Sequence, residues 1–337
     1  MSSSGTGVDQ PEGPFPGPSL LAAAREAVAG IARPTPLLPA PVLSECCGGD
    51  VFCKCENLQV TGSFKVRGAA TRMLALTDSE RRRGVVTCSS GNHGRATAYV
   101  AQRLGIPAVI CVPEWVDPVK LTAMRSHGAR MEIEGATYDE AEAHSFEIAS
   151  AEGLVYVHPF DDPRVIAGQG TIGLELYDDM PGLDTAVVPL SGGGLISGIG
   201  LALKGADPSI RIIGVSAERA RVMHESVQAG RPLEMTEEET IASALSGGIG
   251  TRNRHTLRLV TELVDEYVLV SEAEIAVAMR TVATELKLVV EGGGAVAVAA
   301  LLAGKLELPG QRVAVVVSGG NVDPALYTSI LNSASRS

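Results

Sequence analysis

The chain has 337 residues, about twice the size of a typical single domain, and 45% of them are hydrophobic, so we expect two core-forming units. Only 4% are aromatic and the formal net charge is −11, which argues against a nucleic-acid partner because phosphates need a basic face and bases need aromatic rings. The apolar stretches are short and interrupted by Gly, Pro or charged residues, so we predict no membrane span and a cytosolic protein.

Residues 1–18 form a segment rich in Ser, Gly and Pro, without a basic start or an apolar run. The segment therefore lacks the features of a secretory signal. We predict a disordered tail over 1–18, because it has too little apolar surface to bury.

Six cysteines follow in the first third of the chain: Cys46, Cys47, Cys53, Cys55, Cys88 and Cys111. The first four are adjacent or alternate, which does not match the paired Cys-x-x-Cys spacing of a structural zinc site. The last two end strand-like runs and are typical of buried small side chains. We predict no metal site here and, in a reducing cytosol, no disulfide.

A lysine flanked by polar and small residues lies in the segment Gly62-Ser63-Phe64-Lys65-Val66-Arg67-Gly68. A protonated lysine is a weak nucleophile, and it can form an imine only when it is desolvated or lies beside other cations. We expect Phe64 to desolvate the amine of Lys65 and Arg67 to act as the neighbouring cation. Taken alone, Lys65 is more typical of a solvated lysine at the start of a helix, and only the other motifs favour the imine.

Short β-branched runs alternate with Ala-rich helical stretches through the middle of the chain. The expected strands are 85–88, 108–112, 129–133 and 154–157, and the expected helices are 92–104, a segment after Pro118, and 138–151. This order predicts repeated strand–helix–strand units around a parallel sheet.

A second alternating block follows, with expected strands at 186–190, 212–215, 267–270 and 313–317 and a long amphipathic helix at 272–288. The strands are continuously apolar, which indicates burial on both faces. We predict two α/β domains with a ligand-binding cleft between them.

The glycine-rich turn Ser191-Gly192-Gly193-Gly194-Leu195 joins a buried strand to a helix. Its backbone N–H groups and the helix dipole favour an anion such as a phosphate. It lacks both the Gly-Lys-Ser/Thr ending of a nucleotide-triphosphate loop and the Gly-x-Gly-x-x-Gly spacing of a dinucleotide site. A merely flexible loop is the alternative.

Two further polar turns end strands, at residues 89–94 and 318–321. The first offers hydroxyl and N–H groups for a substrate carboxylate and Asn92 for a ring hydroxyl, although Ser89 or Ser90 as a helix cap is the alternative. In the second, Ser318 is placed to meet a ring nitrogen, unless this is a plain strand-ending turn. An amine, a phosphate loop and polar groups for an aromatic ring together point to pyridoxal phosphate.

At these residues the chain resembles the fold-type II pyridoxal-phosphate enzymes, in the threonine/serine dehydratase and serine racemase branch. The matching motifs occur in the same order, at 63–69, 89–94 and 318–321, and the resemblance spans about residues 31–323. Within the branch, the segments most similar to hydroxyectoine-utilisation dehydratases are 159–161, 166–171, 214–219, 223–224, 247–250 and 290–296. The implied fold is a two-domain α/β structure, similar to the tryptophan synthase β subunit, with parallel-rich twisted sheets flanked by helices.

The resemblance implies roles for individual residues. Lys65 would hold the cofactor as an imine and then abstract the α-proton of the substrate. The other implied cofactor-binding residues are Phe64 near the ring, Asn92 at its 3-hydroxyl, Ser318 at its nitrogen, and Gly192, Gly193, Gly194 and Leu195 at its phosphate. The implied substrate-binding residues are Ser89, Ser90, Gly91 and His93, and Ser90 also matches the second catalytic acid/base of the racemases.

The chain departs from the branch at two places. A divalent cation often follows the segment that ends at Glu218, but the place expected for its Asp ligand holds His224, so we assign no metal ligand. The usual Ala-Asp-Gly is replaced by Ala242-Ser243-Ala244, which we expect to alter the substrate pocket.

From the resemblance we predict a large cofactor-binding domain over 19–75 and 159–332, a small mobile domain over 76–158, and a homodimer. The expected reaction is β-elimination of a β-hydroxy amino acid such as threonine or serine, which gives a 2-oxo acid and ammonia. The alternatives are a hydroxyectoine-utilisation dehydratase, a 3-hydroxyaspartate dehydratase, a serine racemase, or a non-catalytic ligand-binding homologue.

Overall fold

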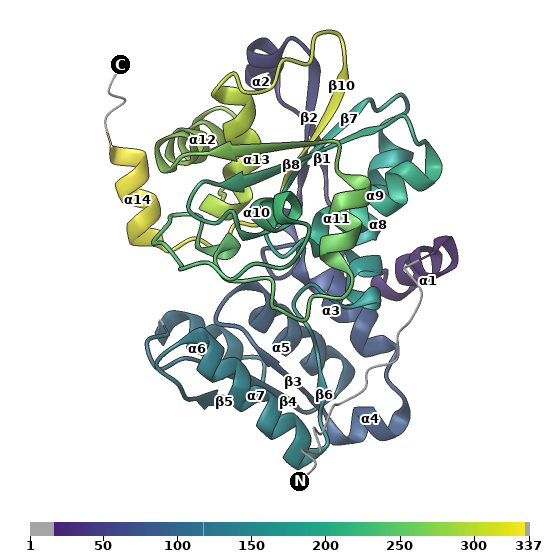
Figure 1. Cartoon of the computed structure of the whole chain (residues 1–337), viewed down its shortest axis with the longest axis vertical. Helices are drawn as coiled ribbons and strands as arrows, with labels where there is room; N and C mark the ends of the chain where they lie inside the picture. Colours follow the sequence, from purple (N-terminus) through teal and green to yellow (C-terminus); the bar gives the residue numbers. More distant parts are fainter. Residues whose placement is uncertain (1–16, 117, 334–337) are drawn as a thin grey trace.

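The computed structural model describes residues 17–116 and 118–333. Residues 1–16 of the predicted tail lie outside the described residues, and Pro18, its last residue, already begins helix α1 (Pro18–Val28). Two sheets with their helices form the molecule, one above the other in Figure 1.

The larger sheet has six strands in the order β1-β2-β10-β7-β8-β9, and only β1 runs antiparallel to its neighbour. Its strands are β1 (Leu37–Pro39), β2 (Asp50–Cys55), β7 (Thr185–Pro189), β8 (Arg211–Ala217), β9 (Glu266–Val270) and β10 (Arg312–Val317). The last four match the strands expected in the second block, whereas β1 and β2 were not expected.

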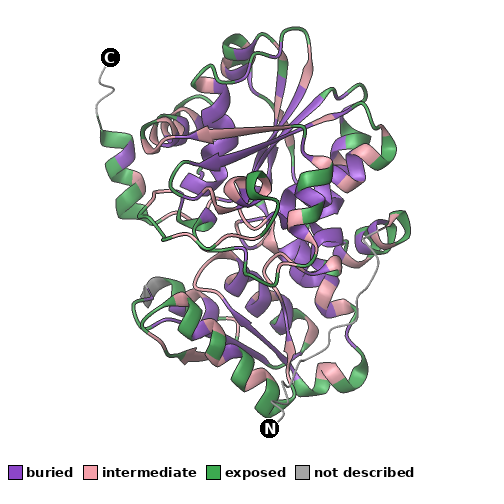
Figure 2. Cartoon of the chain, viewed as in Figure 1, coloured by how far each residue is buried: buried purple, intermediate pink, exposed green. Residues whose placement is uncertain are grey.

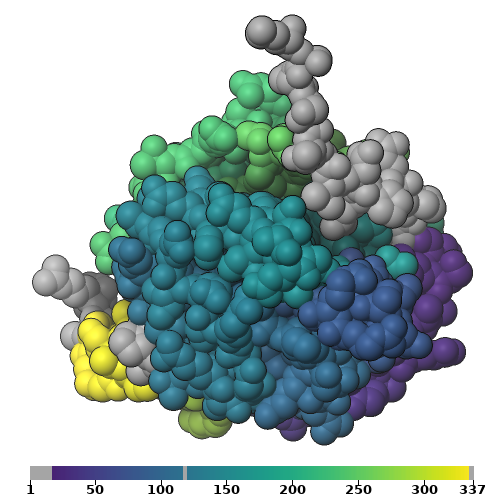
Figure 3. Space-filling model, turned by 90° about the horizontal axis from the view of Figure 1, so that it is seen from below, coloured from purple at the N-terminus to yellow at the C-terminus, as the bar shows by residue number. Residues whose placement is uncertain are grey.

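The smaller sheet has four parallel strands in the order β5-β4-β3-β6. Its strands are β3 (Val85–Cys88), β4 (Ala108–Val112), β5 (Arg130–Ile133) and β6 (Val155–Tyr156), as the first block predicted. These strands and their helices, blue to teal, form the near face of the molecule in Figure 3.

Helices cover both sheets. Besides α1, they are α2 (Pro41–Cys47), α3 (Lys65–Leu74), α4 (Asp78–Arg83), α5 (Asn92–Leu104), α6 (Pro118–Arg125), α7 (Tyr138–Glu152), α8 (Pro163–Asp179), α9 (Gly194–Ala206), α10 (Val222–Ala229), α11 (Thr256–Leu263), α12 (Glu272–Thr284), α13 (Gly292–Leu302) and α14 (Pro324–Asn332). None of the described helices combines the length and apolar character needed to span a lipid bilayer.

Each sheet has helices on both faces, because successive side chains of its central strand point to opposite faces. In β7, Val187 packs in the same core cluster as α13, while its neighbours Ala186 and Val188 pack with α9 on the opposite face. In the smaller sheet, α5 packs on one face of β3, against Val85, and α7 packs on the other face, against Val86. Both central strands are therefore buried throughout, as Figure 2 shows.

The long helix predicted over 272–288 is shorter than expected. Helix α12 ends at Thr284, and Lys287 then adopts a positive φ of 58°. An α-helix cannot continue through a left-handed residue, so the chain turns and runs to Glu291, the residue before α13. The apolar residues after 284 pack as a connecting segment and not as a helix face.

All six cysteines are unpaired. Cys88 and Cys111 lie opposite each other in β3 and β4, and both are buried. Among the described residues, no group of three His, Cys, Asp or Glu side chains is placed to hold a metal ion.

Candidate active site

A cavity of about 580 Å³ lies where the predicted motifs converge. The turns that follow β3, β7 and β10 all open onto it, because the carboxyl ends of parallel strands are where ligand sites form in α/β sheets. Every residue that the sequence predicted for the site lines it: Phe64, Lys65, Ser89, Ser90, Gly91, Asn92, His93, Gly192, Gly193, Gly194, Leu195 and Ser318.

Lys65 is the first residue of α3, is half-buried and lines the cavity. Its Nζ donates a hydrogen bond to the carbonyl of Pro159 at 2.8 Å and lies 5.3 Å from the centroid of the Phe64 ring. Burial lowers the pKa of Lys65 to about 8, and the nearby Glu291 carboxylate opposes this shift. A larger fraction of the amine is therefore neutral at physiological pH than in an ordinary lysine.

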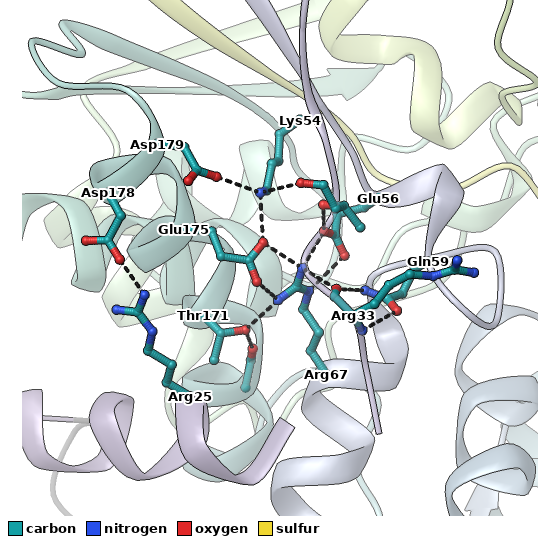
Figure 4. Close-up of polar contacts among 12 residues, drawn as sticks. Arg25, Arg33, Lys54, Glu56, Gln59, Arg67, Thr171, Glu175, Asp178 and Asp179 are labelled. Carbon is teal, nitrogen blue, oxygen red and sulfur yellow. Dashed lines mark hydrogen bonds and ion pairs between the residues drawn. The ribbon is translucent and has the colours of Figure 1, made fainter. Parts of the chain in front are cut away.

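The prediction that Arg67 helps to activate Lys65 is wrong. The guanidinium of Arg67 is enclosed by two carboxylates, with hydrogen bonds of 2.8 and 2.9 Å to Glu56 and of 2.6 and 3.0 Å to Glu175. Figure 4 shows this cluster, which Lys54 joins through a 2.7 Å ion pair with Glu175. Arg67 thus anchors α3 to α8 and to the short turn that follows β2, and these carboxylates compensate its charge.

The glycine turn after β7 fits its predicted role as an anion site. A Cβ atom at Gly192 would overlap the ring of Phe160, and Gly193 has a φ of 82°, which favours glycine. Gly193 is also the N-cap of α9 and provides no side-chain cap. The first N–H groups of α9 are therefore available to a phosphate, and the helix dipole favours its charge.

The turn after β3 is similar, and the expectation that Ser89 or Ser90 caps the helix is not met. The N-cap of α5 is Gly91, without a side-chain cap, and Ser89 Oγ instead accepts a 3.3 Å hydrogen bond from Gly91 N. His93 Nε2 donates to the carbonyl of Val157 at 3.0 Å, and burial lowers the pKa of His93 to about 3. His93 is therefore neutral, and the start of α5 is a second uncapped helix end at the cavity.

Ser318 lies beside the first turn of α3. Phe64 N donates to the carbonyl of Ser318 at 3.2 Å, and an antiparallel bridge pairs Ser63 with Gly319. Within the part of the chain that the structure describes, the hydroxyl of Ser318 makes one hydrogen bond, a long one of 3.5 Å to the carbonyl of Gly293. This hydroxyl therefore remains able to turn toward a ligand.

Glu291 lines the same cavity, and the sequence did not predict it as a site residue. It is the N-cap residue of α13 but does not cap the helix; its Oε1 accepts a 2.6 Å hydrogen bond from Asn92 Nδ2. Burial raises the pKa of Glu291 to about 7. The only signal in the sequence was an acidic residue directly before the three glycines 292–294, which alone does not indicate a site.

The cavity thus combines a desolvated amine with uncapped starts of α5 and α9 and neutral polar groups from Asn92 and Ser318. This set matches a ligand that carries an aldehyde, a phosphate and a polar aromatic ring. The residues present therefore fit pyridoxal phosphate.

The region around Glu218, where a divalent cation was considered, is occupied by arginine. Arg221 donates through Nη1 to the carbonyl of Glu218 and through Nε lies 3.3 Å from Glu225. His224 Nδ1 lies 3.4 Å from the same Glu225 carboxylate. These contacts are those of a local ion-pair cluster.

The sequence profile of the family described as "Pyridoxal-phosphate dependent enzyme" matches residues 28–319. L-threonine ammonia-lyase of Thermotoga maritima is 43% identical over 309 residues, which cover 92% of this chain and 76% of that protein. L-threonine dehydratase catabolic TdcB of Escherichia coli is 40% identical over 310 residues, which cover 91% of this chain and 93% of that protein.

Among solved structures, maize serine racemase superposes with a TM-score of 0.88 at 35% sequence identity, and the match covers 93% of this chain and 96% of that chain. The predicted fold class is confirmed by this match and by the parallel-rich sheets. The chain therefore belongs to the pyridoxal-phosphate-dependent enzymes, with the fold-type II architecture and pyridoxal phosphate as its cofactor.

Proposed function

We propose that this chain eliminates water from a β-hydroxy amino acid, with threonine or serine as the substrate. The enamine that leaves the site tautomerises to an imine, and its hydrolysis takes up one water and releases ammonia and a 2-oxo acid. The observation that carries the proposal is the desolvated amine of Lys65, with its lowered pKa, in the cavity that also contains the Gly192–Gly194 turn. Relatives at 40% to 43% identity that are named threonine dehydratase or ammonia-lyase support this choice of substrate class.

The cofactor, when bound, supplies an aldehyde for covalent attachment and a ring that takes up the electron pair left when the α-proton is removed. Lys65 provides the neutral amine for that attachment. The same Lys65 amine, when free, would be the base that accepts the α-proton of the substrate. Its pKa of about 8 suits this task, because it then exists in both protonation states near neutral pH.

The remaining cofactor contacts follow from the position of each group in the cavity. The Gly192–Gly194 turn and Leu195 would hold the phosphate at the start of α9, and Ser318 would face the ring nitrogen with a neutral hydroxyl. Asn92 would bond the ring 3-oxygen, and Phe64 would lie near the ring. These positions keep the ring fixed while the bonds of the substrate change.

The substrate carboxylate would bind at the turn between β3 and α5. Ser89, Ser90 and Gly91 offer hydroxyl and backbone N–H donors there, and the start of α5 adds a favourable dipole. A neutral His93 adds no charge of its own. The negative carboxylate would thus be held by neutral donors.

We also propose the division into a large unit over 19–75 and 159–332 and a small mobile unit over 76–158, supported by the two separate sheets. The homodimer remains a proposal, which size-exclusion chromatography with light scattering would test. Slower hydrogen exchange over 76–158 on substrate binding would support mobility of the small unit, and unchanged exchange would contradict it.

The substrate test is a set of separate incubations with L-threonine, L-serine, 3-hydroxyaspartate and hydroxyectoine, with release of 2-oxo acid and ammonia measured in each. We expect activity on threonine or serine and its loss in Lys65→Ala. Lys204→Ala is the matched control, because Lys204 is paired with Asp265 away from the cavity. Activity restricted to hydroxyectoine or 3-hydroxyaspartate would select those alternatives, and equal activity in Lys65→Ala would refute the mechanism.

Racemisation is a second candidate activity, favoured by Ser90 in the cavity and by the 35% identity to maize serine racemase. A hydroxyl on the face of the substrate opposite Lys65 would return the α-proton with inverted configuration. Chiral chromatography after incubation with L-serine would detect D-serine, and its complete absence would exclude this activity.

A further inference from the structure

Four side chains form a continuous series of hydrogen bonds along the wall of the cavity, and we call this series the amide chain: Arg95, Asn321, Asn92 and Glu291. Arg95 Nη1 donates to Asn321 Oδ1 at 2.8 Å, Asn321 Nδ2 donates to Asn92 Oδ1 at 2.7 Å, and Asn92 Nδ2 donates to Glu291 Oε1 at 2.6 Å. Arg95 and Asn92 belong to α5, whereas Asn321 follows β10 and Glu291 precedes α13. The series therefore joins the two sheet units.

The direction of the amide chain is fixed by groups that can play only one role in a hydrogen bond. A guanidinium can only donate, so the atom of Asn321 that faces Arg95 must be its oxygen. A backbone carbonyl can only accept, so the atom of Asn321 that lies 2.9 Å from the oxygen of Thr61 must be its nitrogen. Asn321 consequently has one amide orientation.

That orientation determines the orientation of Asn92. Because Asn321 presents an N–H group, Asn92 must turn its oxygen toward Asn321 and its nitrogen toward Glu291. Among the described residues, Asn92 Nδ2 makes this single hydrogen bond. Its second hydrogen is left for a ligand in the cavity that Asn92 lines.

We propose that Asn321 and Glu291 are positioning residues that hold the Asn92 amide so that it offers an N–H donor, and not a carbonyl oxygen, to the ring oxygen of the cofactor. This inference rests on the role proposed for Asn92 and is independent of which amino acid is the substrate. Without these two neighbours the amide can rotate, and half of its orientations would set an oxygen against an oxygen.

The packing around Glu291 supports a dedicated position for its carboxylate. A Cβ atom at Gly319 would overlap Glu291 Oε1, so the glycine beside Ser318 leaves the space that the carboxylate occupies. Glu291 is only 8% exposed, and its backbone N–H bonds the carbonyl of Gly319 at 3.1 Å. Burial raises the pKa of Glu291, and the hydrogen bond from Asn92 opposes this rise and stabilises the charged form.

The test measures the dissociation constant of pyridoxal phosphate from the apoprotein through quenching of Trp115, the single tryptophan, which lines the cavity. Asn321→Asp exchanges a donor for an acceptor, and we expect it to raise the dissociation constant about 10- to 100-fold, the usual effect of losing a hydrogen bond to a charged group. Asn332→Asp, at the end of α14, is the matched control with the same chemical change.

Glu291 is tested by a pair of variants. Glu291→Ala removes the acceptor, and we expect a similar loss of affinity, whereas Glu291→Gln keeps an acceptor oxygen and should recover most of it. The melting temperature of each apoprotein shows whether it is folded. If Asn321→Asp does not fold, Asn321→Ala removes the donor without adding charge and carries the same prediction.

A double-mutant cycle separates positioning from general structural support. If Asn321 acts through Asn92, Asn321→Asp should have no further effect on affinity in an Asn92→Ala background. Additive losses would overturn the inference. Wild-type affinity in Asn92→Ala would refute the role of Asn92 itself, whereas a loss in Asn92→Ala with none in Asn321→Asp would refute the amide chain alone.

Discussion

The protonation of Lys65 can be titrated in the apoprotein, before any cofactor chemistry begins. With a pKa lowered from 10.5 to about 8, roughly one Lys65 amine in ten is neutral at pH 7, compared with about one in 3,000 for an ordinary lysine. The neutral fraction at pH 7 is therefore about 300 times larger. It should rise nearly tenfold per pH unit up to about pH 7, reach one half near pH 8 and then level off.

Competitive acetylation measures this fraction directly. Apoprotein and Nα-acetyl-lysine amide are treated together with limiting acetic anhydride between pH 6 and 10.5, and peptide mapping gives the acetylation of Lys65 relative to the reference. Restricted access to the cavity would lower the rate at every pH and leave the midpoint unchanged. A midpoint near that of the reference compound would refute the argument that burial depresses the pKa of Lys65.

A substitution at Glu291 gives a second test of the pKa of Lys65. Its carboxylate raises the pKa of Lys65, so replacing it by a neutral side chain should move the acetylation midpoint to lower pH. Glu291→Gln is the appropriate variant because it removes the charge and keeps the shape. A midpoint that moves to higher pH would contradict the assigned electrostatics.

Three further variants test other parts of the account. Arg67→Met should lower the free energy of unfolding by about 3–5 kcal/mol in urea denaturation, because it leaves the charge of Glu56 buried and unpaired, and adding Glu56→Leu should recover part of the loss. Gly193→Ala, at a φ of 82°, should weaken cofactor binding about tenfold, whereas Gly205→Ala at the open end of α9 should not; equal affinities would contradict the phosphate assignment. Ser90→Ala should abolish any D-serine formation while 2-oxo acid is still released, and retained racemisation would refute the role of Ser90.

The sheets were predictable because their central strands are short, continuous runs of apolar residues. The strands expected at 85–88 and 108–112 occur at those residues, and the glycine and serine turns follow the strands as predicted. Such strands are buried on both faces, so their sequences carry the signal themselves. The strand β2 (Asp50–Cys55) was not predicted, because the charged residues Asp50 and Lys54 interrupt its apolar character.

The polar partners were less predictable because they depend on contacts between distant segments. Arg67 is two positions from Lys65 in the sequence. Its guanidinium nevertheless binds Glu175 of α8, which lies 108 positions away. Glu291 lies 199 positions from Asn92, and no local pattern relates the two. Residue spacing within a motif indicates which groups can share a turn, but not what the fold brings against them.

If Lys65 holds the cofactor, chemical reduction of the holoenzyme will fix the cofactor to that residue. The holoenzyme is reduced with borohydride, digested and mapped by mass spectrometry for peptides that carry the reduced cofactor. We expect the label on Lys65 and none in Lys65→Ala. Label on another lysine, or on none, would contradict it.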